Sequence, residues 1–155
     1  MKSRMQNLLN TAYECAAEFS QTFSGSLDPR VYMTLVEEEL AEVSEAFNGD
    51  DEAHKLKELS DLLLVVVALD QLSTAVPAFA DQETKDRMRR IGTMTEMLGD
   101  TFEGHFDTPV VIEALKRVHA SNMSKLGDDG KPIYREDGKV LKGPNYAEPD
   151  LSDLV

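Results

Sequence analysis

Apolar residues recur at intervals of three and four along the first part of the chain, which is the spacing of one helix face. Over residues 3–24 this face comprises Met5, Leu8, Ala12, Cys15, Ala16, Phe19 and Phe23. Gly25 is expected to end this helix. A second helix is predicted from Asp28-Pro29, an N-cap followed by the residue favoured at the first helical position, to Phe47, where Asn48-Gly49 forms a stop.

A third helix is predicted over residues 51–76, capped by Asp51 and ending before Pro77. Its centre, Leu62 to Leu69, is apolar on every side, and by propensity alone it would also suit a buried strand. Strong helix formers flank this centre without a turn signal, and the segment is longer than a strand, so a helix is favoured. Such a helix needs cover on all sides, from further helices or from a partner chain.

Two more helices are predicted over residues 84–98 and 108–126, with a break at Gly99 to Gly104 between them. Residues 77–83 are expected to form a loop. The expected fold class is therefore all-α, a bundle of about five helices in a single domain that spans residues 1–155.

Beyond Gly127 the pattern changes. Short strand-like runs at 133–136 and 139–142 flank Asp137-Gly138, a dipeptide that signals a β-hairpin. The acidic tail with its two prolines is expected to be extended. Residues 127–155 are thus predicted to add a short C-terminal β-hairpin and an extended tail to the bundle.

Composition and charge narrow the classes of function. A net charge of −13 repels the phosphate backbone, so a nucleic-acid polymer is not an expected partner, whereas a single nucleotide needs only a local pocket. Cys15 is the one cysteine, which excludes an intramolecular disulfide and fits a reducing compartment. The longest apolar run, Leu62 to Leu69, is too short to span a bilayer, and the N-terminal residues lack the apolar run of a secretory signal. We expect no membrane partner and a location in the cytoplasm, or in the host cytoplasm if the protein is viral.

Four carboxylates on either side of Asn48-Gly49-Asp50 carry the candidate chemistry. Glu39 and Glu42 share one face of the second helix, and Glu58 and Asp61 share one face of the third. In an antiparallel hairpin the two pairs would meet at levels roughly 12 and 16 Å from the turn. Carboxylates held that close repel one another unless a cation lies between them, and an oxygen-only cluster suits Mg²⁺ or Mn²⁺.

A locally basic segment lies near the C-terminus of this acidic chain. Between residues 116 and 142 the basic residues are Lys116, Arg117, Lys125, Lys131, Arg135, Lys139 and Lys142, and they outnumber the acidic ones. Such a segment could bind a polyphosphate and complement the carboxylates.

These motifs resemble a known enzyme family. Glu38-Glu39-x-x-Glu42, followed after fifteen residues by Glu58-x-x-Asp61, resembles the signature of the MazG-like all-α nucleoside triphosphate pyrophosphohydrolases. The run from Val118 to Lys125, together with Asp137 to Lys142 and Pro149-Asp-Leu151, resembles the phosphoribosyl-ATP pyrophosphohydrolase-like branch of that superfamily. The stretch from Ser73 to Gly104 is longer than the connection in compact members.

The resemblance implies a Mg²⁺-dependent hydrolase that cleaves between the α- and β-phosphates of a nucleoside triphosphate, giving a monophosphate and pyrophosphate. It implies Glu39, Glu42, Glu58 and Asp61 as metal ligands, with Glu38 orienting or activating water beside them. It also implies a homodimer or homotetramer whose sites are completed across subunits. Our candidates for binding the substrate are Asn122, Lys125, Lys139 and Lys142 at the phosphates and Phe19 and Phe23 at the base.

Several alternatives stay open. The first is a true phosphoribosyl-ATP pyrophosphohydrolase of histidine biosynthesis, which cleaves the same bond, and another is a non-catalytic helical nucleotide-binding or assembly module. A di-iron bundle is disfavoured because Glu42 and Asp61 stand where that class has histidines. For the nucleoside triphosphate pyrophosphohydrolase that the resemblance implies, a deoxynucleoside triphosphate is the favoured substrate, with a purine such as dGTP as one option. Each candidate residue also has an ordinary structural explanation. The glutamates could lie on solvated helix faces, the lysines on the surface and the phenylalanines in the core.

Overall fold

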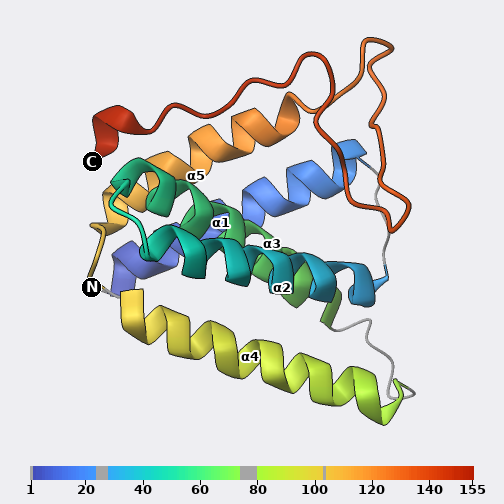
Figure 1. Cartoon of the computed structure of the whole chain (residues 1–155), viewed down its shortest axis with the longest axis horizontal. Helices are drawn as coiled ribbons and strands as arrows, with labels where there is room; N and C mark the ends of the chain where they lie inside the picture. The colour runs from blue at the N-terminus through green and yellow to red at the C-terminus, as the bar shows by residue number, and fades with distance from the viewer. Residues whose placement is uncertain (1, 24–27, 74–79, 103) are drawn as a thin grey trace.

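The computed structural model describes residues 2–23, 28–73, 80–102 and 104–155. The helices in this part of the chain are α1 (Lys2–Phe23), α2 (Pro29–Phe47), α3 (Glu52–Ser73), α4 (Gln82–Phe102) and α5 (Thr108–Met123), followed by a single 3₁₀ turn, η1 (Ser152–Leu154). The prediction of an all-α chain with five α-helices is confirmed (Figure 1).

The predicted starts of α2 and α3 rest on capping side chains. A carboxylate oxygen of Asp28 accepts the backbone N–H of Arg30 at 2.9 Å, and Pro29 occupies the first turn of α2. Asp51 accepts the N–H of His54 at 3.0 Å at the start of α3. These bonds satisfy N–H groups that have no partner within the helix, which is why Asp at these positions marked the boundaries.

The ends of the other helices differ from the prediction. Helix α4 runs on to Phe102, so the break expected from Gly99 onward comes later, at Gly104, whose φ is +83°. Helix α5 ends at Met123, three residues before the predicted 126. There the Ser124 hydroxyl accepts the N–H of Ala147 at 2.9 Å, so the returning tail ends the helix. The predicted end of α3 at residue 76 lies outside the described residues.

No β-strand is present in the described residues, so the two-stranded hairpin predicted for the C-terminal segment is wrong in that form. The Asp137-Gly138 turn does bring Tyr134 and Val140 into a single antiparallel bridge, and Gly138 adopts φ +95°. A two-stranded pair with no third strand to extend it is marginal in water, which explains why the pairing stops at one bridge.

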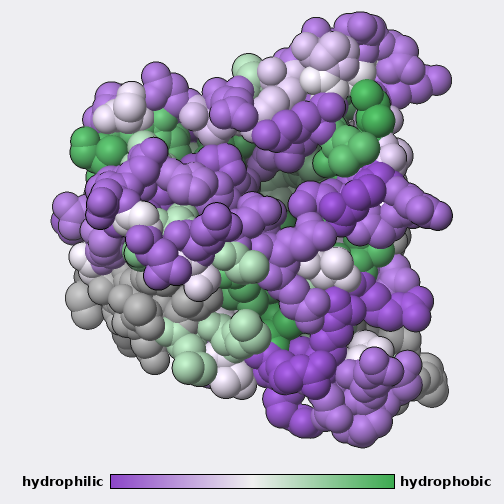
Figure 2. Space-filling view, in the orientation of Figure 1, coloured by the Kyte–Doolittle hydropathy of each residue, from purple (hydrophilic) through white to green (hydrophobic). Residues whose placement is uncertain are grey.

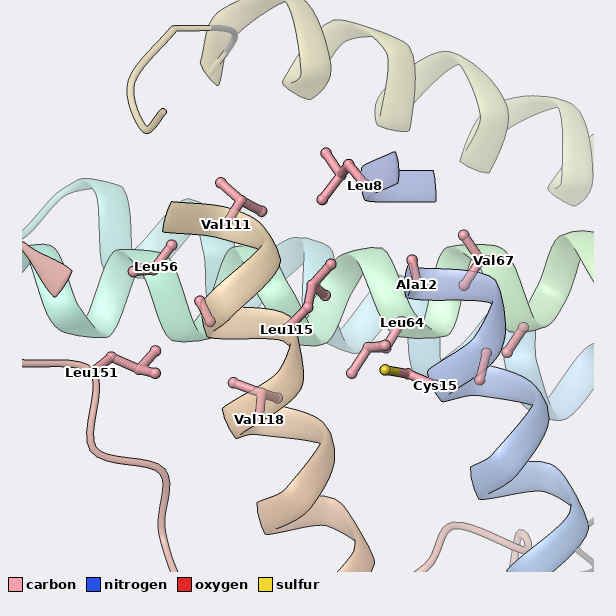
Figure 3. Packing of buried hydrophobic residues seen from close by; sticks show 13 residues of the cluster. Leu8, Ala12, Cys15, Leu56, Leu64, Val67, Val111, Leu115, Val118 and Leu151 are labelled. Carbon is pink, nitrogen blue, oxygen red and sulfur yellow. The ribbon is translucent and has the colours of Figure 1, made fainter. Parts of the chain in front are cut away.

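Helix α3 lies between two hydrophobic cores. One is built from α1, α3 and α5 and includes Leu8, Ala12, Cys15, Leu56, Leu64, Val67, Val111, Leu115, Val118 and Leu151 (Figure 3). The other is built from α2, α3 and α4 and comprises Met33, Val36, Leu40, Val43, Leu62, Leu69 and Ile91. Because α3 contributes to both, its all-round apolar centre is accounted for by helices of the same chain.

The remaining elements cover this arrangement. Figure 1 shows α4 at one edge of the molecule, where it packs on α2, and the C-terminal segment returning along α5. The tail is fixed by Leu151, which is 3% exposed, and by the ion pair of Arg117 with Asp153. Polar side chains cover most of the face in Figure 2. None of the described helices combines the length and apolar character that a bilayer crossing requires.

Candidate functional site

The turn between α2 and α3 brings three acidic side chains together. Glu39 of α2 and Glu58 and Asp61 of α3 each offer one carboxylate oxygen, and these oxygens lie within 4.8 Å of one another. The two helices pack side by side and run in opposite directions from the turn at residues 48–51 (Figure 1). Residues equally far from that turn therefore meet, which is the geometry expected from the sequence. We refer to these three residues as the carboxylate cluster.

Two of the three carboxylates in the cluster are buried and incompletely paired. Glu39 is 9% exposed and Glu58 is 4% exposed. The Oε2 atoms of both are buried without a hydrogen bond to any described group. Burial, followed by repulsion from Asp61 and Glu42, raises the pKa of Glu39 to about 8. Such unsatisfied oxygens are costly, and a bound cation would satisfy them.

Glu42 lies at the exposed margin of the carboxylate cluster and is not one of its three members. Its pKa is raised by partial burial of the carboxyl group and by the charge and hydrogen bond of Glu58. The fourth predicted ligand is thus next to Glu58 and further from the centre than the other three.

Lys57 was not among the residues selected from the sequence, and it contacts the cluster directly. Its Nζ donates to Glu58 Oε1 at 2.9 Å and to Asp61 Oδ2 at 3.0 Å. Burial alone would lower the pKa of Lys57, but Asp61 and Glu58 more than reverse this effect and raise it. The sequence feature that could have predicted this contact is the position of Lys57 four residues before Asp61, a spacing that allows an ion pair on one helix face.

A pocket opens beside the carboxylate cluster. Its enclosed space is about 110 Å³, and it widens into a mouth that is open to solvent. Two cluster members, Glu39 and Asp61, line it together with the predicted substrate residues Phe19, Phe23, Asn122, Lys125 and Lys139. Tyr32, His119 and Cys15, none of them selected from the sequence, also line it.

The two predicted aromatic residues form one wall of this pocket. The rings of Phe19 and Phe23 stack with centroids 4.3 Å apart and planes inclined by 25°. Phe23 is 1% exposed, and its backbone carbonyl accepts the hydroxyl of Tyr134 from the C-terminal segment. These contacts fix Phe23 behind Phe19, so the partly exposed Phe19 ring is the flat apolar surface available to a planar group.

The two pocket lysines reach the site from the C-terminal part of the chain. Burial lowers the pKa of Lys125, although the charges of Asp61 and Glu39 oppose this effect. Lys139 Nζ is 2.6 Å from Glu38 Oε2, and Arg135 is 2.8 Å from Glu38 Oε1. Although burial opposes them, these two partners lower the pKa of Glu38. Glu38 therefore ties the C-terminal turn to α2 and is not part of the carboxylate cluster.

The structure does not bring Lys142 to the pocket. Its Nζ lies 3.4 Å from Glu148 Oε1 and 4.6 Å from the centroid of the Tyr146 ring. Lys142 is near Lys139 in sequence, but it follows the bridge at Val140 and lies outside the pocket lining.

Comparison with known proteins adds little to this geometry. No protein-family model matches the chain, and no curated protein matches it. A solved structure described as a "putative NTP pyrophosphohydrolase" from Exiguobacterium sp. 255-15 aligns over 92% of each chain. The identity is 23% and the TM-score is 0.41. At this TM-score the likeness decides neither fold nor function, so the proposal below rests on the site itself.

The site therefore combines three features. The carboxylate cluster concentrates negative charge at one place, Lys125 and Lys139 supply positive charge nearby, and stacked aromatic rings supply an apolar wall. A ligand that fits all three carries a planar apolar group and an anionic group able to share a divalent cation.

Proposed function

We propose that the protein is a Mg²⁺-dependent nucleoside triphosphate pyrophosphohydrolase. It would cleave between the α- and β-phosphates and release a nucleoside monophosphate and pyrophosphate. The observation that carries the proposal is the carboxylate cluster with its two unpaired buried oxygens. Two of its members, Glu39 and Asp61, line a pocket that is also lined by two lysines and two stacked phenylalanines.

The donor set of the carboxylate cluster fits Mg²⁺, with Mn²⁺ as a substitute. All donors in the cluster are carboxylate oxygens, which these hard cations prefer. The Oε2 atoms of Glu39 and Glu58 have no hydrogen-bond partner among the described residues, so a bound cation would compensate for their burial. Glu39, Glu58 and Asp61 would hold the ion, with Glu42 reaching it from the margin. A divalent ion held there supplies charge neutralisation at phosphate oxygens and a bound water of lowered pKa.

The other residues position the substrate. Lys125 and Lys139 bind phosphate oxygens as charged donors, and Asn122 contributes an amide beside them. Phe19 stacks on the base, with the buried Phe23 ring packed behind it. Glu38 acts through Lys139, because it holds that ammonium group over the pocket. Lys142 is not part of this proposal.

The choice of the α–β bond is supported by the spacing of the acidic residues. Glu38-Glu39-x-x-Glu42 and Glu58-x-x-Asp61 resemble the signature of the MazG-like enzymes, which cleave that bond. The segments Asn122 to Lys125 and Gly138 to Lys142 resemble those of phosphoribosyl-ATP pyrophosphohydrolases. Phosphoribosyl-ATP hydrolysis is therefore the second candidate, and a purine deoxynucleoside triphosphate such as dGTP is the first substrate to test.

We also propose that the protein forms a homodimer or homotetramer. Met94 and Met97 of α4 are 49% and 65% exposed, and Met5 of α1 is 48% exposed. Large apolar side chains left on a helix face are typical of contact surfaces between subunits. Light scattering at several protein concentrations would test this, and a monomer throughout would contradict it.

The test of the reaction is a panel assay. The purified protein is incubated with Mg²⁺ and each ribo- and deoxynucleoside triphosphate, and with phosphoribosyl-ATP, and the products are separated by ion-exchange chromatography. Monophosphate plus pyrophosphate supports the proposal and names the base. Diphosphate plus inorganic phosphate would mean that the other bond is cut. Glu45→Gln, an exposed change on α2, is the matched control for changes in the cluster.

A further inference from the structure

Lys57 holds a position that the proposed reaction does not use. Its ammonium group donates to one oxygen of Glu58 and one oxygen of Asp61, two of the three residues of the carboxylate cluster. Both partners lie on the same helix, one residue and four residues further along α3. The contact is thus built into the helix and does not depend on substrate or on the C-terminal segment.

We propose that Lys57 is the resident counter-ion of the carboxylate cluster. In the metal-free chain it supplies one positive charge that Glu58 and Asp61 share, and it opposes the binding of a divalent cation to the same carboxylates. The inference rests on the metal site proposed above, and it concerns how strongly that site binds its ion.

The buried carboxylates need such a partner. Removing a carboxylate from water without a compensating charge is costly, and Glu58 is 4% exposed. Among the described cationic side chains, Lys57 is the one that bridges two cluster members, while Lys139 is paired with Glu38. His54 reaches Glu58 alone, with Nδ1 3.4 Å from Oε1.

Through the same contacts, Lys57 competes with a metal ion for Glu58 and Asp61. An ion drawn between Glu39, Glu58 and Asp61 would meet a positive charge that lies 2.9 and 3.0 Å from oxygens of two of its ligands. If the ammonium stays, the two cations repel each other; if it leaves, two ion pairs are lost. The Lys57 side chain is 28% exposed, so its flexible stem has a way out to solvent. In either case, the presence of Lys57 weakens metal binding.

The test is a titration with Mn²⁺ alone, followed by calorimetry or by the loss of the free-ion electron paramagnetic resonance signal. Lys57→Met keeps the length of the side chain and removes its charge. We expect Mn²⁺ to bind on the order of tenfold more tightly to this variant than to the wild type, because a unit charge a few ångströms away is removed. Lys57→Arg keeps the charge and should stay near the wild-type affinity. Lys85→Met removes an exposed lysine from α4 and is the matched control.

Thermal unfolding gives a second readout that does not depend on activity. In the presence of EDTA, Lys57→Met should unfold at a lower temperature than the wild type, because the buried carboxylates lose their partner. Saturating Mn²⁺ should then raise its unfolding temperature by more than it raises that of the wild type. A variant that folds only when Mn²⁺ is present would support the inference as well, since the cluster then needs one cation or the other.

The outcomes separate this inference from the proposed function. If Lys57→Met binds Mn²⁺ no more tightly than Lys85→Met, while Asp61→Asn abolishes binding, the metal site stands and the role of Lys57 is wrong. If the wild-type protein binds no Mn²⁺ at all, the metal site fails and the inference fails with it.

Discussion

Replacing Glu39 by glutamine is expected to stabilise the metal-free protein at high pH while removing a proposed metal ligand. The pKa of Glu39 is raised from 4.5 to about 8, chiefly by burial. Below pH 4.5 the carboxyl group is protonated in the folded and the unfolded chain alike, and its ionisation costs nothing. Between pH 4.5 and 8 the folded chain holds a proton that the unfolded chain has lost, so the free energy of unfolding falls as the pH rises.

The magnitude follows from the difference between the two pKa values. The rise in the pKa from 4.5 to about 8 corresponds to about 5 kcal/mol once the pH is well above 8, and about 1 kcal/mol of this is already lost at pH 5. Glutamine is neutral throughout and nearly the same size, so Glu39→Gln removes this penalty. Relative to the wild type, the variant should therefore gain about 4 kcal/mol between pH 5 and pH 9, a shift in unfolding temperature on the order of 10 °C.

The assay is thermal unfolding in EDTA at pH 5 and at pH 9. Comparing the two pH values cancels any constant effect of the glutamine amide, such as a hydrogen bond that it fails to make. Glu45→Gln, the same change at an exposed position of α2, should show no such dependence on pH. If the difference between Glu39→Gln and the wild type is the same at both pH values, Glu39 does not ionise in a buried cluster and the reasoning is refuted.

Three further predictions concern turnover. Asp61→Asn should reduce kcat by at least about 100-fold with an unchanged circular dichroism spectrum, because a charged ligand is lost at an unchanged side-chain size; turnover near the wild-type rate would remove Asp61 from the site. Lys139→Ala should raise KM about tenfold, whereas Lys142→Ala, outside the pocket, should leave KM unchanged. Steady-state kinetics measure both values, and a larger rise in KM for Lys142→Ala than for Lys139→Ala would contradict this prediction. Glu38→Gln should raise KM with little change in kcat, because Glu38 holds Lys139 and Arg135, and a collapse of kcat alone would restore a direct role in activating water.

The main features of the site were accessible from the sequence because a helical hairpin has simple geometry. Equal distances from the Asn48-Gly49 turn predict that Glu39 and Asp61 meet, and α2 and α3 have the lengths that this argument needs. Distance from the turn fixes the height of a residue along the helices but not its depth. That Glu42 faces the margin while Glu58 is buried depends on how the two helices are rotated against each other, which the spacing of residues does not determine.

Contacts between distant parts of the chain were beyond sequence reasoning. Lys139 and Lys142 look alike in sequence, and only the path of the chain after the Asp137-Gly138 turn separates a pocket residue from an outer one. The end of α5 was missed for a similar reason, because Ser124 is engaged by the backbone of Ala147 from the tail. Lys57 was missed although its spacing to Asp61 was visible, because a lysine on a helix usually lies on a solvated face.

The position of α3 between two hydrophobic cores has a consequence for the dynamics of the site. Glu58 and Asp61 alternate along α3 with Leu56, Leu62 and Leu64, which are buried in one core or the other. This stretch cannot open without exposing apolar surface on both sides, so it should belong to the most protected part of the chain. Its amide protons are then expected to exchange with solvent only when the whole molecule unfolds, and the carboxylates on α3 would keep their positions for as long as the fold lasts.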